Sequence, residues 1–244
     1  EQYNMAYFTG PNIVTDGLIY AIDAGSERSY PGSGTAVTAI TGVGNGTLTN
    51  GVGFDSANGG SWTFDGADDY ITFGNNFLVP GISQYDTITN FTIDVWVNWD
   101  NFAVGGLDEI ISWWKSGGST YNDGFLGTTR SGQGGTAANP SIRFGDGWTD
   151  TGVYFTSATD TGKWFNIVAI KTSNNAYVYV NGVLRATKGS ALSWGFNDYP
   201  AVGRHPNLTE WLDGKVSNIK LYNTALTAVQ VTQNFNAQKS RFGL

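Results

Sequence analysis

Three aspartates at one predicted turn are the residues of this sequence best suited to bind a metal ion. Asp65, Asp68 and Asp69 lie within five residues of one another. A bent loop that presents several carboxylate oxygens is the ligand set that Ca²⁺ prefers. Aspartate is also frequent in turns because its side chain accepts hydrogen bonds from the nearby backbone. The sequence therefore predicts either a calcium site or an ordinary Asp-rich turn here, with Asp23 and Asp213 as further acidic candidates.

Tryptophan side chains offer a second kind of chemistry, stacking on the rings of a sugar. The candidates by position are Trp113, Trp114 and Trp148, with Trp194 and Trp211 beside them. Adjacent residues of a strand point to opposite faces. At least one ring of the Trp113 and Trp114 pair therefore faces solvent or is covered by a loop or partner, and both alternatives stay open. A sugar-binding surface built on these rings is one prediction, and subunit or loop contact is the other.

Catalytic groups are scarce. A glycoside hydrolase needs two carboxylates that face one cleft, which on a single strand means acidic residues two or four apart. Asp108 and Glu109 are adjacent and point to opposite faces, and Asp94 has no acidic residue at 92, 96 or 98. His205 is the only histidine, so neither a Ser-His-Asp triad nor a zinc site is supported. We predict that the protein is not an enzyme.

Composition excludes several partners. The net charge is −7, the 13 Lys and Arg are scattered, and there is no Cys. Nucleic-acid binding needs clustered cations, so we expect no nucleic-acid partner. Disulfides and thiolate metal sites are excluded. No run of about 18 apolar residues and no secretion signal is present, so we also expect no membrane partner.

Alternating apolar and polar residues predict the strands that must position these groups. Residues 91 to 99 read FTIDVWVNW, which places alternate apolar residues on one face and Trp96 on the other, polar face. Residues 164 to 171 are nearly continuously apolar, which is typical of a central strand covered on both sides. Residues 17 to 24 predict a first strand. Shorter strands are expected at 109 to 114, 125 to 130, 141 to 145, 153 to 156, 201 to 203 and 215 to 222.

Turns and one helix complete the expected fold. Asn181-Gly182 between two apolar runs predicts a type I′ hairpin. Two alternating segments within residues 62 to 73 flank a polar turn and predict another hairpin. Thr227 and Gln230 form a capping box, which predicts a helix start. We expect an N-terminal extension at 1–16 and, over 17–244, a single all-β domain: an antiparallel β-sandwich with one short C-terminal helix.

Several blocks resemble the laminin-G-like family, a concanavalin A-like lectin jelly roll. They are, in order, GLIYAIDAG, WTFDGADDYITF, FTIDVWVNW, WFNIVAIKTSNNAYVYVNGVL, AVGR and LDGKVSNIKLYNTALTAVQV. The resemblance extends over most of residues 17 to 235. It implies the jelly-roll fold, and it implies that calcium is a common ligand of such domains. These blocks encode strand faces and turns, so they bear more on fold than on function.

The opening MAYFTGPNIVTDGLIYAIDAGSERSYPGSG and the ending NFNAQKSRFGL resemble structural proteins of tailed phages that carry this domain. That resemblance implies a virion protein, made in the host cytoplasm, that decorates the capsid or forms part of a tail or fibre. Its partners would be other virion proteins or copies of itself. The absence of Cys agrees with assembly in a reducing cytoplasm. The alternative function is a carbohydrate-binding module that recognises a cell-surface glycan.

Overall fold

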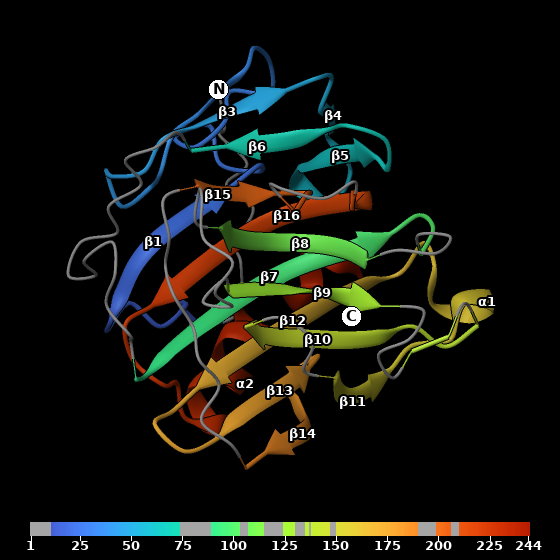
Figure 1. Ribbon diagram of the computed structural model, residues 1–244. Coiled ribbons are helices and arrows are strands. Elements are labelled where there is room, and N and C mark those ends of the chain that lie inside the picture. The colour runs from blue at the N-terminus through green and yellow to red at the C-terminus, as the bar shows by residue number, and fades with distance from the viewer. Residues whose placement is uncertain are drawn as a thin grey trace.

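The computed structural model consists of two antiparallel β-sheets that face each other (Figure 1). It describes residues 11–73, 89–102, 107–114, 124–129, 135–136, 138–146, 150–189, 199–205 and 210–244. The all-β sandwich predicted from the sequence is confirmed. Each sheet contains eight strands, and all the pairings between the strands of the described residues are antiparallel.

The first sheet is centred on two long neighbouring strands, β7 (Phe91–Trp99) and β16 (Asp213–Tyr222). Its order is β14-β13-β12-β7-β16-β5-β4, and β1 also pairs with β16. The remaining strands are β1 (Leu18–Asp23), β4 (Gly53–Asp55), β5 (Ser61–Asp65), β12 (Trp164–Lys171), β13 (Ala176–Val180) and β14 (Val183–Lys188). The central position predicted for residues 164 to 171 is confirmed, because β12 pairs with both β7 and β13.

The second sheet has the order β11-β10-β9-β8-β15-β6-β3-β2. Its strands are β2 (Ala36–Val37), β3 (Gly46–Thr49), β6 (Tyr70–Thr72), β8 (Leu107–Trp114), β9 (Gly124–Thr129), β10 (Ser141–Asp146), β11 (Asp150–Tyr154) and β15 (Tyr199–Val202). Between β2 and β6 the chain also forms β4, β5 and the 3₁₀ turn η1 (Ala57–Gly59). Residues 25 to 60 thus hold three short strands, β2, β3 and β4.

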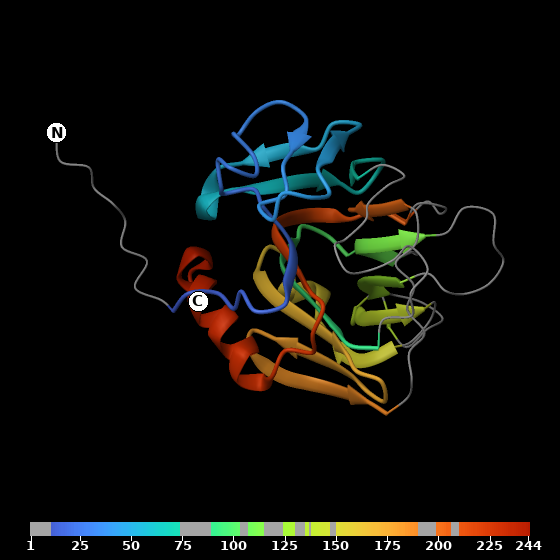
Figure 2. The same ribbon diagram turned by 90° about the vertical axis from the view of Figure 1, so that its left-hand side faces the viewer.

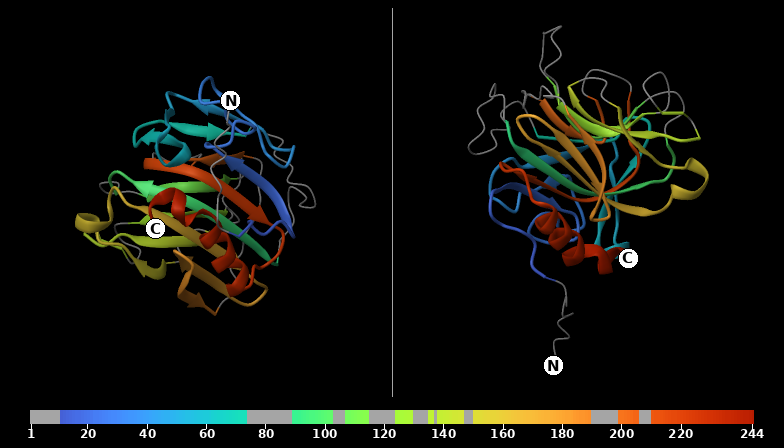
Figure 3. Two further views of the ribbon diagram at one scale, coloured as in Figure 1. Left: turned by 180° about the vertical axis from the view of Figure 1, so that it is seen from behind. Right: turned by 90° about the horizontal axis from the view of Figure 1, so that it is seen from below.

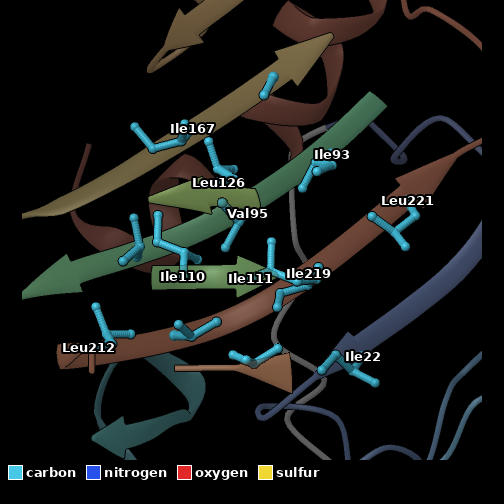
Figure 4. Close-up of a cluster of buried hydrophobic side chains, with 14 of the residues drawn as sticks. Ile22, Ile93, Val95, Ile110, Ile111, Leu126, Ile167, Leu212, Ile219 and Leu221 are labelled. Atoms are coloured by element: carbon cyan, nitrogen blue, oxygen red, sulfur yellow. The ribbon is translucent and has the colours of Figure 1, made fainter. Parts of the chain in front are cut away.

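Branched apolar side chains from both sheets fill the space between them (Figure 4). Ile93, Val95 and Ile219 come from the first sheet, and Ile111 and Leu126 come from the second. Each is at most 2% exposed. Burial of such side chains is the dominant stabilising contribution to a domain of this kind.

A C-terminal helix covers the outer face of the first sheet (Figures 2 and 3). The helix α2 (Ala228–Gln238) starts at Thr227, whose side chain accepts from the Gln230 backbone in the capping box predicted from the sequence. The 3₁₀ turn η2 (Lys239–Phe242) follows. A second helix, α1 (Ser157–Asp160), is a single turn. The cover provided by α2 and η2 explains why all nine residues of β7 are buried, including those on its polar face.

The residues 11–16 described at the N-terminal side are packed against this helix. Val14 is buried, its backbone N–H donates to Oδ1 of Asn234 at 2.8 Å, and its carbonyl accepts from the Tyr222 hydroxyl at 3.1 Å. No helix among the described residues is long and apolar enough to cross a membrane.

One predicted hairpin is confirmed and one is wrong. Asn181 and Gly182 have φ of 51° and 77°, the positive values that a type I′ turn between β13 and β14 requires. The two segments within residues 62 to 73 do not pair with each other. β5 joins β16 in the first sheet and β6 joins β15 in the second, so the polar turn between them crosses from one sheet to the other. Alternation within two short runs indicates strands but does not decide which strands pair.

Candidate functional site

The crossing turn between β5 and β6 brings the three predicted aspartates together. Asp65, Asp68 and Asp69 each have a carboxylate oxygen within 4.8 Å of those of the other two. We call these residues the acidic turn. Asp65 and Asp68 are exposed and Asp69 is buried. Burial, followed by the nearby charge of Asp65, raises the pKa of Asp69 above its ordinary value.

Hydrogen bonds within the acidic turn account for part of its carboxylate oxygens. Oδ1 of Asp65 accepts from the Ala67 backbone at 2.9 Å, and Oδ2 of Asp69 accepts from the Asp65 backbone at 3.2 Å. Oδ1 of Asp69 is buried and has no hydrogen-bond partner. A buried acceptor without a donor is costly, and a cation is one group that satisfies it. The donor set therefore fits Ca²⁺, with Asp65, Asp68 and Asp69 as the residues that would hold it.

The two further acidic candidates differ in their surroundings. Asp213 lies against the acidic turn, since a Cβ on Gly66 would be 2.9 Å from the Asp213 Cβ, and the charges of Asp100 and Asp65 add to burial in raising the pKa of Asp213. Asp23 is instead paired with Arg241, whose Nη1 lies 2.9 and 3.0 Å from its two carboxylate oxygens. Asp23 thus has a structural partner and lies apart from the acidic turn.

The tryptophans that are candidates for ligand binding differ in how far they are buried. The Trp113 ring is 1% exposed and belongs to the core between the sheets, so it offers no stacking surface. The Trp114 side chain, Trp148 and Trp194 lie outside the described side chains and residues. Trp211 is partly exposed. Of the five tryptophan candidates, Trp211 is the one with a described ring at the surface.

Trp96 is also a buried ring. It is fully buried beneath the C-terminal helix, with its ring centroid 4.0 Å from that of Phe242 and 5.9 Å from that of Phe235. Its Nε1 donates to Gln238 at 3.1 Å. The polar face of β7 is thus an intramolecular contact rather than a ligand surface.

Trp211 belongs to a surface cluster that the sequence did not predict, made of Tyr70, Arg204 and Trp211. We call it the Arg204 cluster. The guanidinium carbon of Arg204 lies 3.6 Å from the Tyr70 ring centroid and 5.9 Å from the Trp211 ring. The two rings have centroids 6.2 Å apart. All three side chains are partly exposed. Aromatic faces with a polar group beside them are suited to sugar rings.

Strand register and one glycine position the Arg204 cluster. Val202 pairs with Ile71, and both side chains are buried in the core, so Tyr70 points to the outer face of the second sheet. Gly203 has φ of 87°, and a Cβ there would collide with the Phe64 ring. Arg204 and Trp211 are joined by an antiparallel β-bridge. The block AVGR contains this glycine, but nothing in it signals that Arg204 reaches Tyr70.

Four titratable side chains near Arg204 act on one another through their charges: Glu109, Arg143, His205 and Glu210, which we call the Glu109 group. Gly127 of β9 pairs with Glu109 of β8 on one side and with Arg143 of β10 on the other. Glu109 and Arg143 therefore share the outer face of the second sheet. The His205 backbone donates to the Glu210 carbonyl at 3.0 Å. Glu109 is fully buried, and neither of its carboxylate oxygens has a hydrogen-bond partner.

The pKa values of Glu109, Glu210 and His205 are all shifted in the direction that favours the neutral form. Burial raises the pKa of Glu109 well above its usual range, and the charge of Glu210 adds to this effect. Burial raises the pKa of Glu210 to about 7, against the opposing effect of Arg143. Burial, together with the charges of Arg143 and Arg204, lowers the pKa of His205 to about 4. The sequence placed Glu109 and Asp108 on opposite faces, and the structure confirms it, because Asp108 accepts instead from the buried Thr128 hydroxyl at 3.1 Å.

Solved structures with this fold include parts of larger sugar-active and receptor-binding proteins. Trypanosoma rangeli sialidase in complex with sialic acid superposes with a TM-score of 0.66 at 16% identity, over 95% of this chain and 35% of that one. The receptor-binding domain of botulinum neurotoxin C/D mosaic serotype superposes with a TM-score of 0.66 at 14% identity, over 92% of this chain and 52% of that one. This chain therefore spans about a third of the sialidase. At such identities the likeness shows the fold alone.

A third similar structure is almost the same size as this chain. Domain 4 of AbnA, an extracellular GH43 arabinanase from Geobacillus stearothermophilus, in complex with arabinotriose, matches with a TM-score of 0.61 at 15% identity, over 90% of this chain and 98% of that one. No curated protein sequence matches this chain. The sequence pattern of the concanavalin A-like lectin/glucanases superfamily matches residues 65–232, which is more than half of the chain. The chain therefore belongs to the concanavalin A-like lectin/glucanases superfamily.

Proposed function

We propose that this chain is a non-catalytic carbohydrate-binding module whose sugar contact is the Arg204 cluster. The observation that carries the proposal is the pair of partly exposed rings, Tyr70 and Trp211, with centroids 6.2 Å apart at an interplanar angle of 39°. Two inclined faces of this kind form a shallow receptor for a pyranose or furanose ring. The arabinotriose complex of the similarly sized AbnA domain supports a sugar as the ligand class.

The Glu109 group supports binding rather than hydrolysis. A glycosidase needs a protonated and an ionised carboxyl group that both touch the substrate. Glu109 is fully buried, so in this conformation its carboxyl cannot reach a glycosidic oxygen. The other acidic cluster, the acidic turn, contains carboxylates that are neighbours in one turn rather than on two sides of a cleft. An assay for release of reducing sugar from each glycan that binds tests this part, and any turnover that Glu109→Gln abolishes would overturn it.

Binding itself is tested by intrinsic tryptophan fluorescence during titration with plant, bacterial and animal oligosaccharides. Trp211 is the ring expected to report, because it is partly exposed and in the cluster. The expected result is saturable quenching by at least one sugar that Trp211→Phe removes. A flat response across the panel, with an intact fold, would contradict the proposal.

For the place where the module acts, we propose the surface of a tailed-phage virion, as a capsid decoration or a tail or fibre component. Described residues of the two segments that resemble phage structural proteins contact each other on the first sheet's side of the fold. Asn234, in the ending segment, binds Val14, in the opening one, and Arg241 binds Asp23. The Arg204 cluster belongs to the second sheet. If virion proteins bind the side of the fold formed by the first sheet, the Arg204 cluster stays accessible to a host glycan.

Mass spectrometry of purified particles tests the virion proposal. Peptides of this chain are expected in particles at a stoichiometry set by capsid or tail symmetry. Their absence from particles of a phage that encodes the chain would overturn the location, while leaving the sugar-binding proposal to its own test.

A further inference from the structure

We propose that Arg204 is a receptor for the carboxylate of an acidic sugar, so that the module selects carboxylated over neutral glycans. This inference rests on the proposed carbohydrate-binding function and names the ligand class of the same cluster. It depends on three observations: the missing partner of the Arg204 guanidinium, its geometry over the rings, and the charge of its surroundings.

Arg204 has no acidic partner in the described part of the chain. Its Nε is buried without a hydrogen-bond acceptor. No carboxylate oxygen of the described residues lies within 4.0 Å of its guanidinium nitrogens, so it forms no ion pair with them. Burial lowers the pKa of Arg204, and the group that opposes this effect is Tyr70 rather than a carboxylate. Arg241, which is also partly buried, shows the contrast, because Asp23 and two carbonyl oxygens accept hydrogen bonds from its guanidinium.

The rings hold the guanidinium in place without using its hydrogen-bond donors. At 3.6 Å from the Tyr70 centroid, Arg204 is fixed through the face of the ring. A guanidinium presents its N–H groups in a planar fork that matches a carboxylate in two parallel hydrogen bonds. Contact through the face leaves that fork unpaired. The Trp211 ring beside it provides the apolar contact for the sugar ring that carries the carboxylate.

The two carboxyl groups of the Glu109 group are shifted towards their neutral forms, although the protein as a whole carries −7. Burial raises the pKa of Glu109 well above its usual range and that of Glu210 to about 7, and burial lowers the pKa of His205 to about 4. Arg143 and Arg204 keep their charge. The acidic turn is the opposing feature, since the Asp69 carbonyl packs against Gly203. An anionic ligand is therefore favoured at the guanidinium itself rather than over the surface in general.

Matched acidic and neutral probes test the inference. Trigalacturonic acid and its methyl ester, and sialyllactose and lactose, are titrated calorimetrically against the full chain and three variants. Arg204→Gln removes the charge and the fork, and Arg204→Lys keeps the charge but loses the fork. Arg185→Gln removes an exposed arginine of β14 as the matched control. Thermal melting of each variant confirms that it is folded.

We expect at least one acidic probe to bind about tenfold or more tightly than its neutral partner, because charge-assisted hydrogen bonds are roughly twice as strong as neutral ones. Arg204→Gln should reduce the acidic probe to the affinity of the neutral one. Arg204→Lys should retain part of the preference, and Arg185→Gln should change nothing.

Four outcomes would overturn the inference. Equal binding of acidic and neutral probes by the native chain would refute the selectivity and leave the proposed function intact. A preference for acid that survives in Arg204→Gln would mean that another residue is the receptor. Binding of a glutamate-rich peptide but of neither acidic sugar would assign the guanidinium to a protein partner. Binding of no sugar at all would refute the proposed function together with this inference.

Discussion

Asp94 and Lys220 face each other across the two central strands of the first sheet, with Oδ1 3.6 Å from Nζ and side chains that are 0% and 4% exposed. Asn234 of α2 donates to the second Asp94 oxygen at 2.8 Å, and Lys220 donates to Gln238 at 2.8 Å. This network attaches the C-terminal helix to the sheet. The polar face of β7 is therefore part of the interior.

Removing one charge of this pair is expected to be far more costly than removing both. Lys220→Met leaves the buried Asp94 carboxylate without its counter-charge, and loss of one partner of a buried pair costs about 3 to 5 kcal/mol of unfolding free energy. The double variant Asp94→Asn with Lys220→Met should lose less than half of that. Urea unfolding measures both, with the exposed Lys163→Met as control. Equal losses in the single and double variants would mean that the pair is not coupled.

Arg241 joins η2 to the start of the fold, and its position depends on a glycine. A methyl group on Gly25 would collide with the Gly59 carbonyl and the Arg241 guanidinium. We expect Gly25→Ala to destabilise the fold by roughly 2 to 4 kcal/mol because it also displaces Arg241 from Asp23. The comparison is Gly34→Ala, where no atom lies within 4 Å but φ is 82°, so that only backbone strain of about 1 kcal/mol applies. A smaller loss for Gly25→Ala than for Gly34→Ala would refute this account.

Calcium is expected to stabilise the fold through the acidic turn. At a concentration 100 times its Kd, an ion that binds only the folded state adds about 2.7 kcal/mol. The melting temperature should rise with Ca²⁺ and fall with a chelator, and Asp69→Asn should abolish the difference. Asp160→Asn, at a residue of α1 paired with Lys163, is the control. An identical melting temperature with calcium and with chelator would rule out the site.

The Glu109 group predicts opposite pH effects on stability for two neighbouring residues. Glu210 keeps its proton up to about pH 7 in the folded state, whereas the unfolded carboxyl loses it near 4.5. The unfolded state therefore holds fewer protons, and stability falls as pH rises across this window. The unfolding free energy of Glu210→Gln, relative to that of the native chain, should therefore increase from pH 4.5 to 7. Above pH 7 this difference should stay constant.

His205 has the reverse sign. It is neutral down to about pH 4 when folded but protonates near 6.5 when unfolded, so its contribution is lost as pH falls through this range. His205→Gln should therefore gain stability relative to the native chain below pH 6.5. Urea unfolding at several pH values measures both differences, with the exposed Glu27→Gln as control. A parallel pH dependence in the two variants would contradict the assignment.

The sequence predicted most strands correctly because each carries its own signal. The alternation of residues 91 to 99 and the Asn181-Gly182 turn are local patterns, and local sterics determine what they form. Pairing depends on distant partners. The segments on either side of the acidic turn looked like one hairpin, yet β5 meets β16 and β6 meets β15. No feature within residues 62 to 73 identifies those partners.

Only the part of the candidate site whose residues are close together in the sequence was predictable. Asp65, Asp68 and Asp69 lie within one turn, so their clustering follows from the sequence. The Arg204 cluster joins residues 70, 204 and 211, which come together because β15 lies beside β6. Trp113 and Trp96 were ambiguous because a tryptophan signals burial and binding equally well. The first packs in the core and the second lies under α2, whose position on the sheet the capping box did not predict.

Titration of the native chain, Tyr70→Ala and Trp211→Ala with the tightest sugar found in the oligosaccharide panel tests the central claim most directly. Tyr154→Ala serves as the matched control, because this tyrosine of β11 is 48% exposed and lies outside the cluster. Stacking on one ring is worth about 1.4 kcal/mol, so each cluster variant should weaken binding about tenfold while Tyr154→Ala leaves it unchanged. Native affinity in folded Tyr70→Ala and Trp211→Ala would contradict the account.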